Sequence, residues 1–334
     1  MLYERKIALK LCDYVNYWYQ MYRMPKQAET TKVATLSLIE NHINCSDISN
    51  MELEELTTQD IQKFLTEELL HGKKTRLKNL DLRGTPLSPH TIIKLRQILI
   101  AVLKKAVQEN LVTKNVAENT EAIPLPWHDS PVFSPDGQRK FLAAAINHRF
   151  YTAYVLLFYL GCRRSEILGL SWDAIDLRKN ILTIRQILVI ENGQIVLRQR
   201  TKTRNSIRTI PFPKEIKVLL VEWRKKQREE SRQDGYKNEH NLVFCNKDGS
   251  PHNPAYFSRN FKALVKKLDF CSDELHLHST RHTWATNMVQ LGIGIADIQS
   301  IGGWSRPDTL LNIYAHAVKE SQRKAMKKLF KELQ

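Results

Sequence analysis

The sequence lacks long apolar runs. No stretch of about 18 apolar residues occurs among its 334 residues, so we expect no membrane-spanning helix. The N-terminal stretch MLYERKIALKLCDY also lacks the long apolar segment and small-residue cleavage site of a secretion signal. These absences predict a cytoplasmic protein with no membrane partner.

Cysteine is sparse and scattered. The five cysteines, Cys12, Cys45, Cys162, Cys245 and Cys271, are odd in number and form no CxxC pair. This pattern argues against a disulfide framework and a zinc site, and it fits a reducing compartment. The sequence also has no acidic cluster of the kind that holds Mg²⁺. We therefore expect neither a metal nor another cofactor.

Positive charge, in contrast, is abundant. The formal net charge is +16, from 51 Lys and Arg against 35 Asp and Glu. Residues 1–150 hold 20 basic and 17 acidic residues, whereas residues 151–334 hold 31 and 18. Such a field attracts a polyanion and makes contacts with a phosphate backbone favourable. Charge indicates the class of partner and not the fold, so a basic protein without a nucleic-acid partner remains an alternative.

The length suits two domains of roughly 100–200 residues each. Residues 1–122 predict a helical domain because apolar side chains recur there at helical spacing. Two such runs are Val33, Leu36, Ile39 and Ile43, and Leu95, Leu99, Val102 and Leu103. Ser88 and Pro89 resemble an N-cap followed by proline at the first helical position. The polar, basic stretch 71–88 predicts a surface loop.

Three prolines in EAIPLPWHDSP predict a linker at residues 123–134, followed by a second domain at 135–316. Its apolar, β-branched runs at 181–190 and 194–200 flank Glu191-Asn192-Gly193, which suits a hairpin turn. A third run at 207–213 is expected to complete the same small sheet. Helices are predicted at 135–147, 151–160, 215–231, 255–268, 280–290, 295–301, 307–315 and 317–333. The predicted fold class is mainly α with a small antiparallel β-sheet.

Three separated segments carry residues suited to phosphodiester chemistry. They are GCRRSEILGLSWDAIDL (161–177), RTKTRNSIRTIPFP (200–213), and HLHSTRHTWATNMVQLGI with IGGWSRPDTLLNIYAH (276–293 and 301–316). Cleavage of a phosphodiester without metal needs cations against the charge on the non-bridging oxygens, a nucleophile, and groups that move protons. Guanidinium groups suit the first task, because each presents a planar fork and stays charged.

These segments resemble the tyrosine recombinase, or phage integrase, family. GCRRSEILGLSW resembles its first arginine box, KTRNSIRTIPFP its β-hairpin lysine segment, HSTRH its His-x-x-Arg box, and GGWSRPDTLLNIYAH the box that leads to its nucleophilic tyrosine. LSPHTIIKLRQILIAVLKKAVQENLV is similar, more loosely, to the family's core-binding domain. The resemblance implies a helical, SAM-like core-binding domain and a mixed α/β catalytic domain. One of these sequence boxes alone would be weak evidence for the family, whereas four boxes in the family's order are specific to it.

Carried over residue by residue, the resemblance implies six catalytic residues: Arg163, Lys202, His278, Arg281, Trp304 and Tyr314. The two arginines would hold the scissile phosphate. Lys202 would protonate the leaving 5′-oxygen, and His278 would act in proton transfer with the tyrosine. Trp304 stands where most members have histidine, and its indole N–H can donate but cannot act as a base. Tyr314 would attack phosphorus and form a 3′-phosphotyrosine.

The arginines and the lysine have plainer alternative roles. Arg163 would pair with Glu166 on a helix surface, which would leave Arg164 as the rival for the phosphate. Lys202 lies near other basic residues and would then be part of a basic face, together with Arg200, Arg204 and Arg208.

The histidine and the aromatic residues have alternatives too. His276 and His282 flank His278, although the His-x-x-Arg spacing of one helical turn favours His278. Trp304 and Tyr314 would otherwise be packing aromatics, which are common in cores.

Further basic residues are candidates for contacts with the DNA backbone: Lys73, Lys74, Arg76, Lys94, Arg96, Lys104, Lys105, Arg164 and Arg204. Periodicity does not show which side chains reach base edges, so the target sequence stays open. The partners implied by the resemblance are double-stranded DNA with specific recombination sites, a homotetramer on that DNA, and excisionase or host DNA-bending factors.

The function implied is site-specific DNA recombination that integrates or excises a mobile element, with Xer-like dimer resolution as the alternative. A type IB topoisomerase and a catalytically inert DNA-binding protein are further readings. Because the chain enters the core-binding region almost at once, no separate arm-binding domain is expected. Residues 317–334 predict a basic helix that packs on its own domain or docks on a neighbouring protomer.

Overall fold

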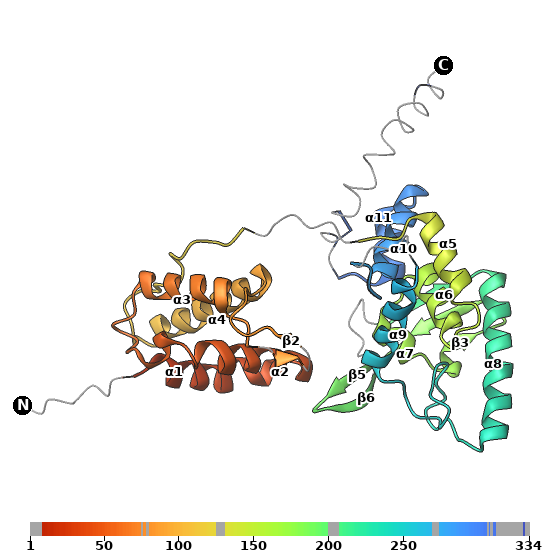
Figure 1. Cartoon of the computed structure of the whole chain (residues 1–334), viewed down its shortest axis with the longest axis horizontal. Coiled ribbons are helices and arrows are strands. Elements are labelled where there is room, and N and C mark those ends of the chain that lie inside the picture. The colour runs from red at the N-terminus through yellow and green to blue at the C-terminus, as the bar shows by residue number, and fades with distance from the viewer. Residues whose placement is uncertain are drawn as a thin grey trace, which may run out of the picture. The chain divides into compact units, whose positions relative to one another are not determined.

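The computed structural model describes residues 9–74, 76–77, 80–124, 131–199, 207–268, 274–305, 307, 310–311 and 330. The chain divides into two compact units, Met1–His128 and Asp129–Gln334 (Figure 1). Three predicted site residues, Lys202, Arg204 and Tyr314, lie outside the described residues, and so does the side chain of Arg76. The helix predicted at 317–333 and most of that at 307–315 also lie outside them.

Helices build the first unit, as the sequence predicts (Figure 1). The α-helices are α1 (Leu11–Trp18), α2 (Glu29–Leu38), α3 (Thr58–His71) and α4 (Pro89–Gln108). π-helical turns at Tyr19–Arg23 and Ile39–Ile43 extend α1 and α2, and 3₁₀ turns lie at Met24–Lys26 and Asp47–Asn50. The prediction of a plain loop at 71–88 was wrong in part, because β1 (Arg76–Leu77) and β2 (Leu80–Asp81) pair there as a two-stranded antiparallel ribbon.

Helix α4 forms the centre of the first unit's core. Its N-cap is Ser88, whose hydroxyl accepts a hydrogen bond from the backbone N–H of Thr91, and Pro89 opens the helix. The four residues of the predicted stripe on this helix are at most 1% exposed: Leu95, Leu99, Val102 and Leu103. The other predicted stripe was wrong at Val33, which is 58% exposed because only the later part of that helical run faces the core.

We expect Leu99→Ala to lower the free energy of unfolding of the first unit by about 2–5 kcal/mol, because it removes fully buried methyl groups and leaves a cavity. Val33→Ala is the matched control, and it should change that free energy by less than about 0.5 kcal/mol. Chemical denaturation of the full chain measures both. Equal effects of the two substitutions would contradict the core described here.

The second unit packs helices around two small antiparallel sheets (Figure 1). Its helices are α5 (Pro135–Ala144), α6 (Tyr151–Leu160), α7 (Arg164–Leu168), a 3₁₀ turn at Trp172–Ala174, α8 (Lys214–Asp234), α9 (Pro254–Lys266), α10 (Ser279–Gln290) and α11 (Ile295–Gly302). Almost every side chain of α6 is buried, and this helix contacts α5, α7, α8 and α10. The mainly α fold with small antiparallel sheets is therefore confirmed. No helix in the described ranges is long and apolar enough to cross a membrane.

The strands form two sheets where the sequence predicted one. Strands β3 (Ile175–Asp176), β4 (Ile181–Ile184) and β7 (Arg208–Pro211) form one sheet, and β5 (Gln186–Glu191) and β6 (Gln194–Gln199) form a separate hairpin. The run 181–190 predicts one strand, but the chain changes partners at Arg185: Ile184 pairs with β7, and Gln186 pairs with β6.

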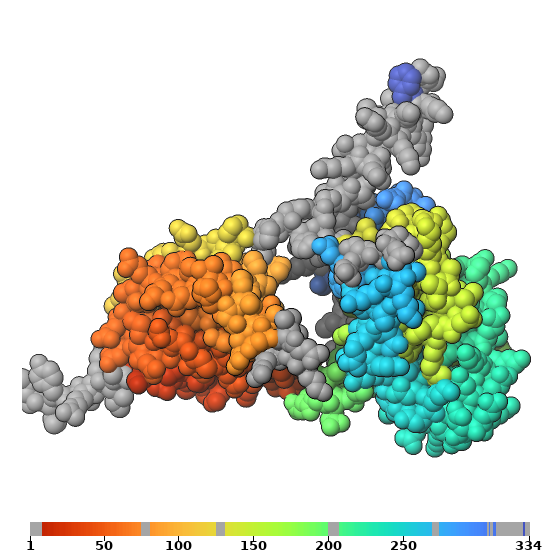
Figure 2. Space-filling model, in the orientation of Figure 1, coloured from red at the N-terminus to blue at the C-terminus, as the bar shows by residue number. Residues whose placement is uncertain are grey.

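The hairpin turn itself is confirmed. Asn192 and Gly193 both have positive φ, 49° and 76°, which is the backbone that a two-residue turn of this kind requires. The hairpin stands out at the edge of the second unit, where Figure 2 shows its atoms in green.

Candidate functional site

The site begins where α6 ends at Gly161. This residue has a φ of 61°, and a Cβ there would lie 2.4 Å from the ring of Trp284. Glycine is therefore required at this position for two reasons, the left-handed backbone and the close approach of the indole. The carbonyl oxygen of Gly161 accepts a hydrogen bond of 2.6 Å from Nη1 of Arg281. The turn after α6 thus joins the first arginine box to α10.

Arg163 is the N-cap residue of the short helix α7, and hydrogen bonds hold both its backbone and its guanidinium. Its backbone N–H donates to Oε2 of Glu166 at 2.8 Å, and its Nη1 donates to Oε1 of the same carboxylate at 2.8 Å. Its Nη2 donates to the carbonyl oxygen of Gly303 at 2.7 Å. The pairing with Glu166 weighed in the sequence does occur, but Glu166 is fully buried and does not lie on a helix surface.

Glu166 receives a second guanidinium, that of Arg208 on β7. Nη1 and Nη2 of Arg208 donate to the two carboxylate oxygens at 2.9 and 2.8 Å. Burial alone would raise the pKa of Glu166, but hydrogen bonds and charge from Arg208 and then Arg163 hold it at about 2. The carboxylate therefore stays ionised between two arginines. We name this group, Arg163, Glu166 and Arg208, the arginine–glutamate triad.

Arg281 is almost completely enclosed, at 1% exposure. Its guanidinium carbon lies 3.5 Å from the ring centroid of Trp304, which is a cation–π contact. Among the described residues, no acceptor lies within hydrogen-bonding distance of its Nη2. Burial, followed by the charge of Arg163, lowers the pKa of Arg281 to about 9. An anion that reaches this group would relieve both the unmade hydrogen bond and the desolvated charge.

Trp304 belongs to the same arrangement. Its ring lies nearly parallel to that of Trp284, at 11° and a centroid distance of 6.1 Å. A Cβ on Gly302 would lie 1.9 Å from this indole, so a glycine must precede it. Trp304 therefore packs, partly buried, against the cluster of Trp284 and also contacts Arg281, while donation of its indole N–H to a phosphate stays a prediction.

His278 lies immediately before α10, one turn from Arg281. Its ring is 4.8 Å from that of His282 in an edge-to-face contact and 6.5 Å from that of His276, between centroids. Burial of part of the ring, followed by charge on His282 and Arg281, lowers the pKa of His278 to about 4. At neutral pH the imidazole is therefore neutral, the form that can accept a proton.

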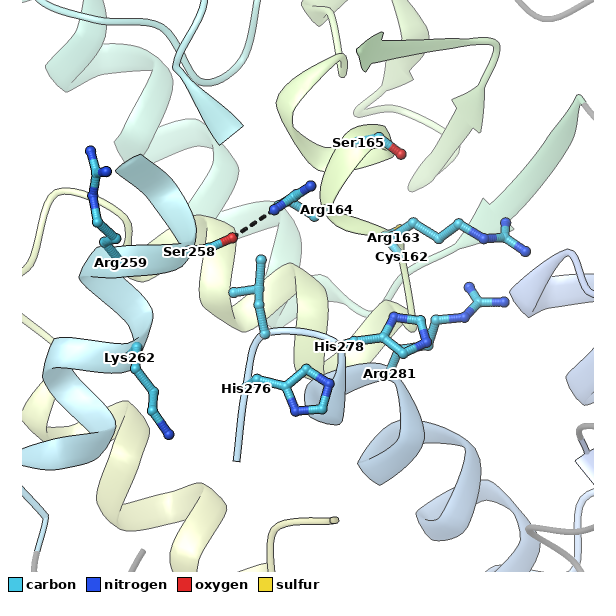
Figure 3. A pocket seen from close by; sticks show the side chains of 11 residues that line it. Cys162, Arg163, Arg164, Ser165, Ser258, Arg259, Lys262, His276, His278 and Arg281 are labelled. Carbon is cyan, nitrogen blue, oxygen red and sulfur yellow. Dashed lines mark hydrogen bonds between the residues drawn. The ribbon is translucent and has the colours of Figure 1, made fainter. Parts of the chain in front are cut away.

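These groups open into one basic pocket of about 580 Å³. Its lining includes five cationic side chains and two histidines: Arg163, Arg164, Arg259, Lys262, Arg281, His276 and His278. Figure 3 shows Arg163, His278 and Arg281 on one side, and Arg259 and Lys262 on α9 at the other. Between them the exposed Arg164 donates to Oγ of Ser258 at 2.8 Å. Such a pocket suits a phosphate and its charged neighbours along a strand.

Family models match both units. The model of the phage integrase family matches residues 131–321, and that of the phage integrase N-terminal SAM-like domain matches residues 10–69. The chain belongs to the phage integrase family. The resemblance stated from the four boxes is therefore confirmed, and with it the class of enzyme, a tyrosine-type site-specific DNA recombinase.

Individual relatives agree with this assignment. The "Tyrosine recombinase XerC-like" protein of Caldanaerobacter subterraneus subsp. tengcongensis is 26% identical over 96% of this chain and 82% of its own length. The ICEBs1 integrase of Bacillus subtilis is 26% identical over 81% of this chain and 72% of its own length. A solved structure of the Tn1549 transposon integrase with transposon right end DNA shares the fold, with a TM-score of 0.78 and 20% identity, and covers 96% of this chain and 99% of that one.

The structure brings four of the six predicted catalytic residues of this recombinase together. Arg163, His278 and Arg281 line the pocket, and Trp304 stacks on Arg281. Lys202 and Tyr314 lie outside the described residues, so their roles stay predictions. Sequence reasoning did not single out Arg259 and Lys262. Their spacing of three on α9, away from its buried apolar stripe, was the signal that could have identified them.

The residues of the first unit that are predicted to contact the DNA backbone differ in their surroundings. Arg96 donates to Oγ1 and the carbonyl of Thr120 and to the carbonyl of Glu118, and Lys105 forms an ion pair with Glu109 at 3.4 Å. These two side chains already hold their own unit together. Lys74 is exposed but also lies 3.7 Å from a carboxylate oxygen of Glu68. Lys94 and Lys104 are exposed, and Lys73 is half-buried.

Gly161→Ala should lower the free energy of unfolding by roughly 2–5 kcal/mol, because it adds left-handed strain to a clash with Trp284. Gly193→Ala is the matched control: its φ is also positive, but a Cβ there meets nothing within 4 Å. It should cost only the strain, about 1 kcal/mol. Thermal and chemical unfolding measure both variants, and a Gly161→Ala variant as stable as the control would refute the close packing at this turn.

The ring of His278 should titrate far below an ordinary histidine. Because the shift lowers the pKa, the ring stays neutral as the pH falls through 6.5 and gains its proton only near pH 4. NMR of the ring protons in the free protein, assigned with a His278→Gln variant, measures the midpoint. A midpoint at or above 6.5 would show that the ring is not desolvated as described.

Proposed function

We propose that this recombinase cuts and rejoins DNA at specific sites to integrate or excise a mobile element, through a covalent 3′-phosphotyrosine at Tyr314. One observation carries the proposal: Arg163 and Arg281, 118 positions apart in the sequence, line one basic pocket, and the buried Nη2 of Arg281 has no hydrogen-bond partner among the described residues. Two guanidiniums facing one space match the two non-bridging oxygens of a phosphodiester.

The proposed reaction uses these groups as follows. The phenolic oxygen of Tyr314 attacks phosphorus while its proton passes to neutral His278. The bond from phosphorus to the 5′-oxygen breaks, and Lys202 gives that oxygen a proton. Arg163 and Arg281 offset the charge that grows on the non-bridging oxygens. The ester to tyrosine keeps the bond energy, so attack by a 5′-hydroxyl reverses the step and rejoins a strand.

Cys162 also lines the pocket and is the obvious competitor as a nucleophile. Burial raises the pKa of its thiol to about 12, so it remains protonated at working pH. A thiol is a poor nucleophile compared with its thiolate. The environment of Cys162 therefore favours an oxygen nucleophile from elsewhere in the chain.

The relatives support the wider scheme. Several are named integrases or transposases of mobile elements, including those of ICEBs1 of Bacillus subtilis and Tn916 of Enterococcus faecalis. We propose that four protomers exchange two pairs of strands through a Holliday junction, with residues 317–334 docking on a neighbour. Excisionase or host DNA-bending factors would set the direction.

Dimer resolution of the Xer type is the second candidate, favoured by the XerC-like relative, which matches over 96% of this chain and 82% of its own length. The chemistry would be the same, and the substrate would differ. Attachment-like repeats or a small excisionase-like gene beside the coding sequence would indicate a mobile element. A site near the chromosome terminus would indicate dimer resolution.

A nicked duplex that carries the recombination site tests the proposed chemistry. Loss of the short fragment beyond the nick traps the covalent intermediate, so the wild-type protein should form a protein–DNA adduct visible by denaturing electrophoresis. Tyr314→Phe should form none, since it lacks the attacking oxygen. Tyr159→Phe, which removes an exposed hydroxyl on α6, is the matched control and should form it normally. No adduct from wild type on its own site, or an undiminished one from Tyr314→Phe, would refute the proposal.

A further inference from the structure

Arg208 lies at the junction of three segments that carry predicted catalytic residues. It is the first residue of β7, the strand that follows the segment of Lys202. Its Nη1 and Nη2 donate to Glu166 of the first arginine box, and its Nε donates to the carbonyl of Ile301 at 2.6 Å. Ile301 lies three positions before Trp304. One side chain thus joins β7, α7 and the end of α11.

The packing around Arg208 is close. Its side chain is only 7% exposed, and a Cβ on Gly303 would lie 2.8 Å from its Nη1. Arg208 is also absent from the lining of the pocket, which Arg163 and Arg281 share. It therefore does not face this pocket, and we expect its effect on a phosphate bound there to pass through its contacts.

The charges of the arginine–glutamate triad decide what that effect is. Glu166 carries one negative charge, and two guanidiniums oppose it. Arg208 is buried against it, whereas the side chain of Arg163 is 32% exposed and faces the pocket. The triad thus presents a net charge of +1, and its exposed end is Arg163. Without Arg208, the charge of Glu166 would offset more of the charge of Arg163 at the pocket.

We infer that Arg208 is a positioning residue of this recombinase: it neutralises Glu166 so that the charge of Arg163 remains available to the scissile phosphate. The inference rests on the proposed function, since it concerns the strength of the same phosphate site. Glu166 in turn fixes the geometry of Arg163, because its carboxylate accepts hydrogen bonds from the backbone N–H and from Nη1 of Arg163. Glu166 thereby sets the position of Arg163, and Arg208 preserves the positive charge that Arg163 presents.

The rate of adduct formation on the nicked duplex, under single-turnover conditions, measures this. Arg208→Met should slow the step by roughly tenfold to a hundredfold, because Glu166 would then draw on the charge of Arg163 without the guanidinium of Arg208 to share it. Arg208→Lys keeps the charge without the fork and should be slowed less than Arg208→Met. Lys225→Met, which breaks an exposed ion pair with Glu229 on α8, is the matched control and should react at the wild-type rate.

A double-substitution cycle separates this role from a merely structural one. If Arg208 acts by opposing the charge of Glu166, its loss should matter little once that charge is gone. Glu166→Gln and Glu166→Gln with Arg208→Met should then react within about threefold of each other. This comparison does not require Arg208→Met alone to fold. The double variant buries no unpaired charge at this place, and in Glu166→Gln the amide oxygen and the carbonyl of Ile301 remain as acceptors for Arg208. A double variant far slower than Glu166→Gln would overturn the inference.

A neutral substrate gives a second readout. A methylphosphonate at the scissile position removes one negative oxygen, so the charge presented by Arg163 matters less there. The ratio of the wild-type rate to the Arg208→Met rate should fall toward one on this substrate. An unchanged ratio, or an Arg208→Met variant as fast as wild type on the ordinary phosphate, would overturn the inference. If wild type forms no adduct at all, it is the proposed function that fails.

Discussion

The buried carboxylate of Glu166 is the interaction on which the rest of the site depends. Taking a carboxylate out of water costs several kcal/mol unless cations and hydrogen bonds replace the solvent. Here four described hydrogen bonds do so: two from the guanidinium of Arg208, one from the guanidinium of Arg163 and one from the backbone N–H of Arg163. These four described bonds bring α7 and β7 together, and the remaining donors of the two arginines reach the carbonyls of Gly303 and Ile301. A single buried charge therefore fixes the distance between segments more than 130 positions apart in the sequence.

Arg281 is held in a different way, by packing more than by charge. Gly161 supplies one acceptor, and the indole of Trp304 covers one face of the guanidinium. Behind it, Trp284 fills the space that Gly161 leaves by having no Cβ. The result is a cation that has lost its water but not all of its hydrogen-bonding capacity, which is why its pKa falls to about 9. A preformed, partly unsatisfied donor of this kind stabilises charge that develops during a reaction without having to reorganise.

Sequence patterns predicted most of the elements and named Arg163, His278 and Arg281, which the structure places around one pocket, because both depend on local signals. The stripe of α4, the cap at Ser88 and the Asn192-Gly193 turn each follow from side chains within a few positions. The change of sheet at Arg185 could not be predicted, because strand pairing depends on partners distant in sequence and the apolar run continues unbroken through it. For the same reason Arg208 was read as one of several basic residues, although its role is set by Glu166, 42 positions earlier.

The net charge of a chain is a poor guide to where its ligand binds. In the second unit Arg149 is held by Glu230 and Arg208 by Glu166, and in the first Lys105 is held by Glu109. These cations add to the formal charge but face carboxylates of the chain itself. Two cations of the pocket differ because the hydrogen-bond partners that the structure describes for them are neutral: a carbonyl for Arg281 and a hydroxyl for Arg164. Arg163 is the exception, since it contacts Glu166, and it can serve a phosphate only because a second arginine shares that carboxylate. The site thus consists of cations whose charge is not offset by a carboxylate of the chain. For Arg163, it is Arg208 that prevents this offset.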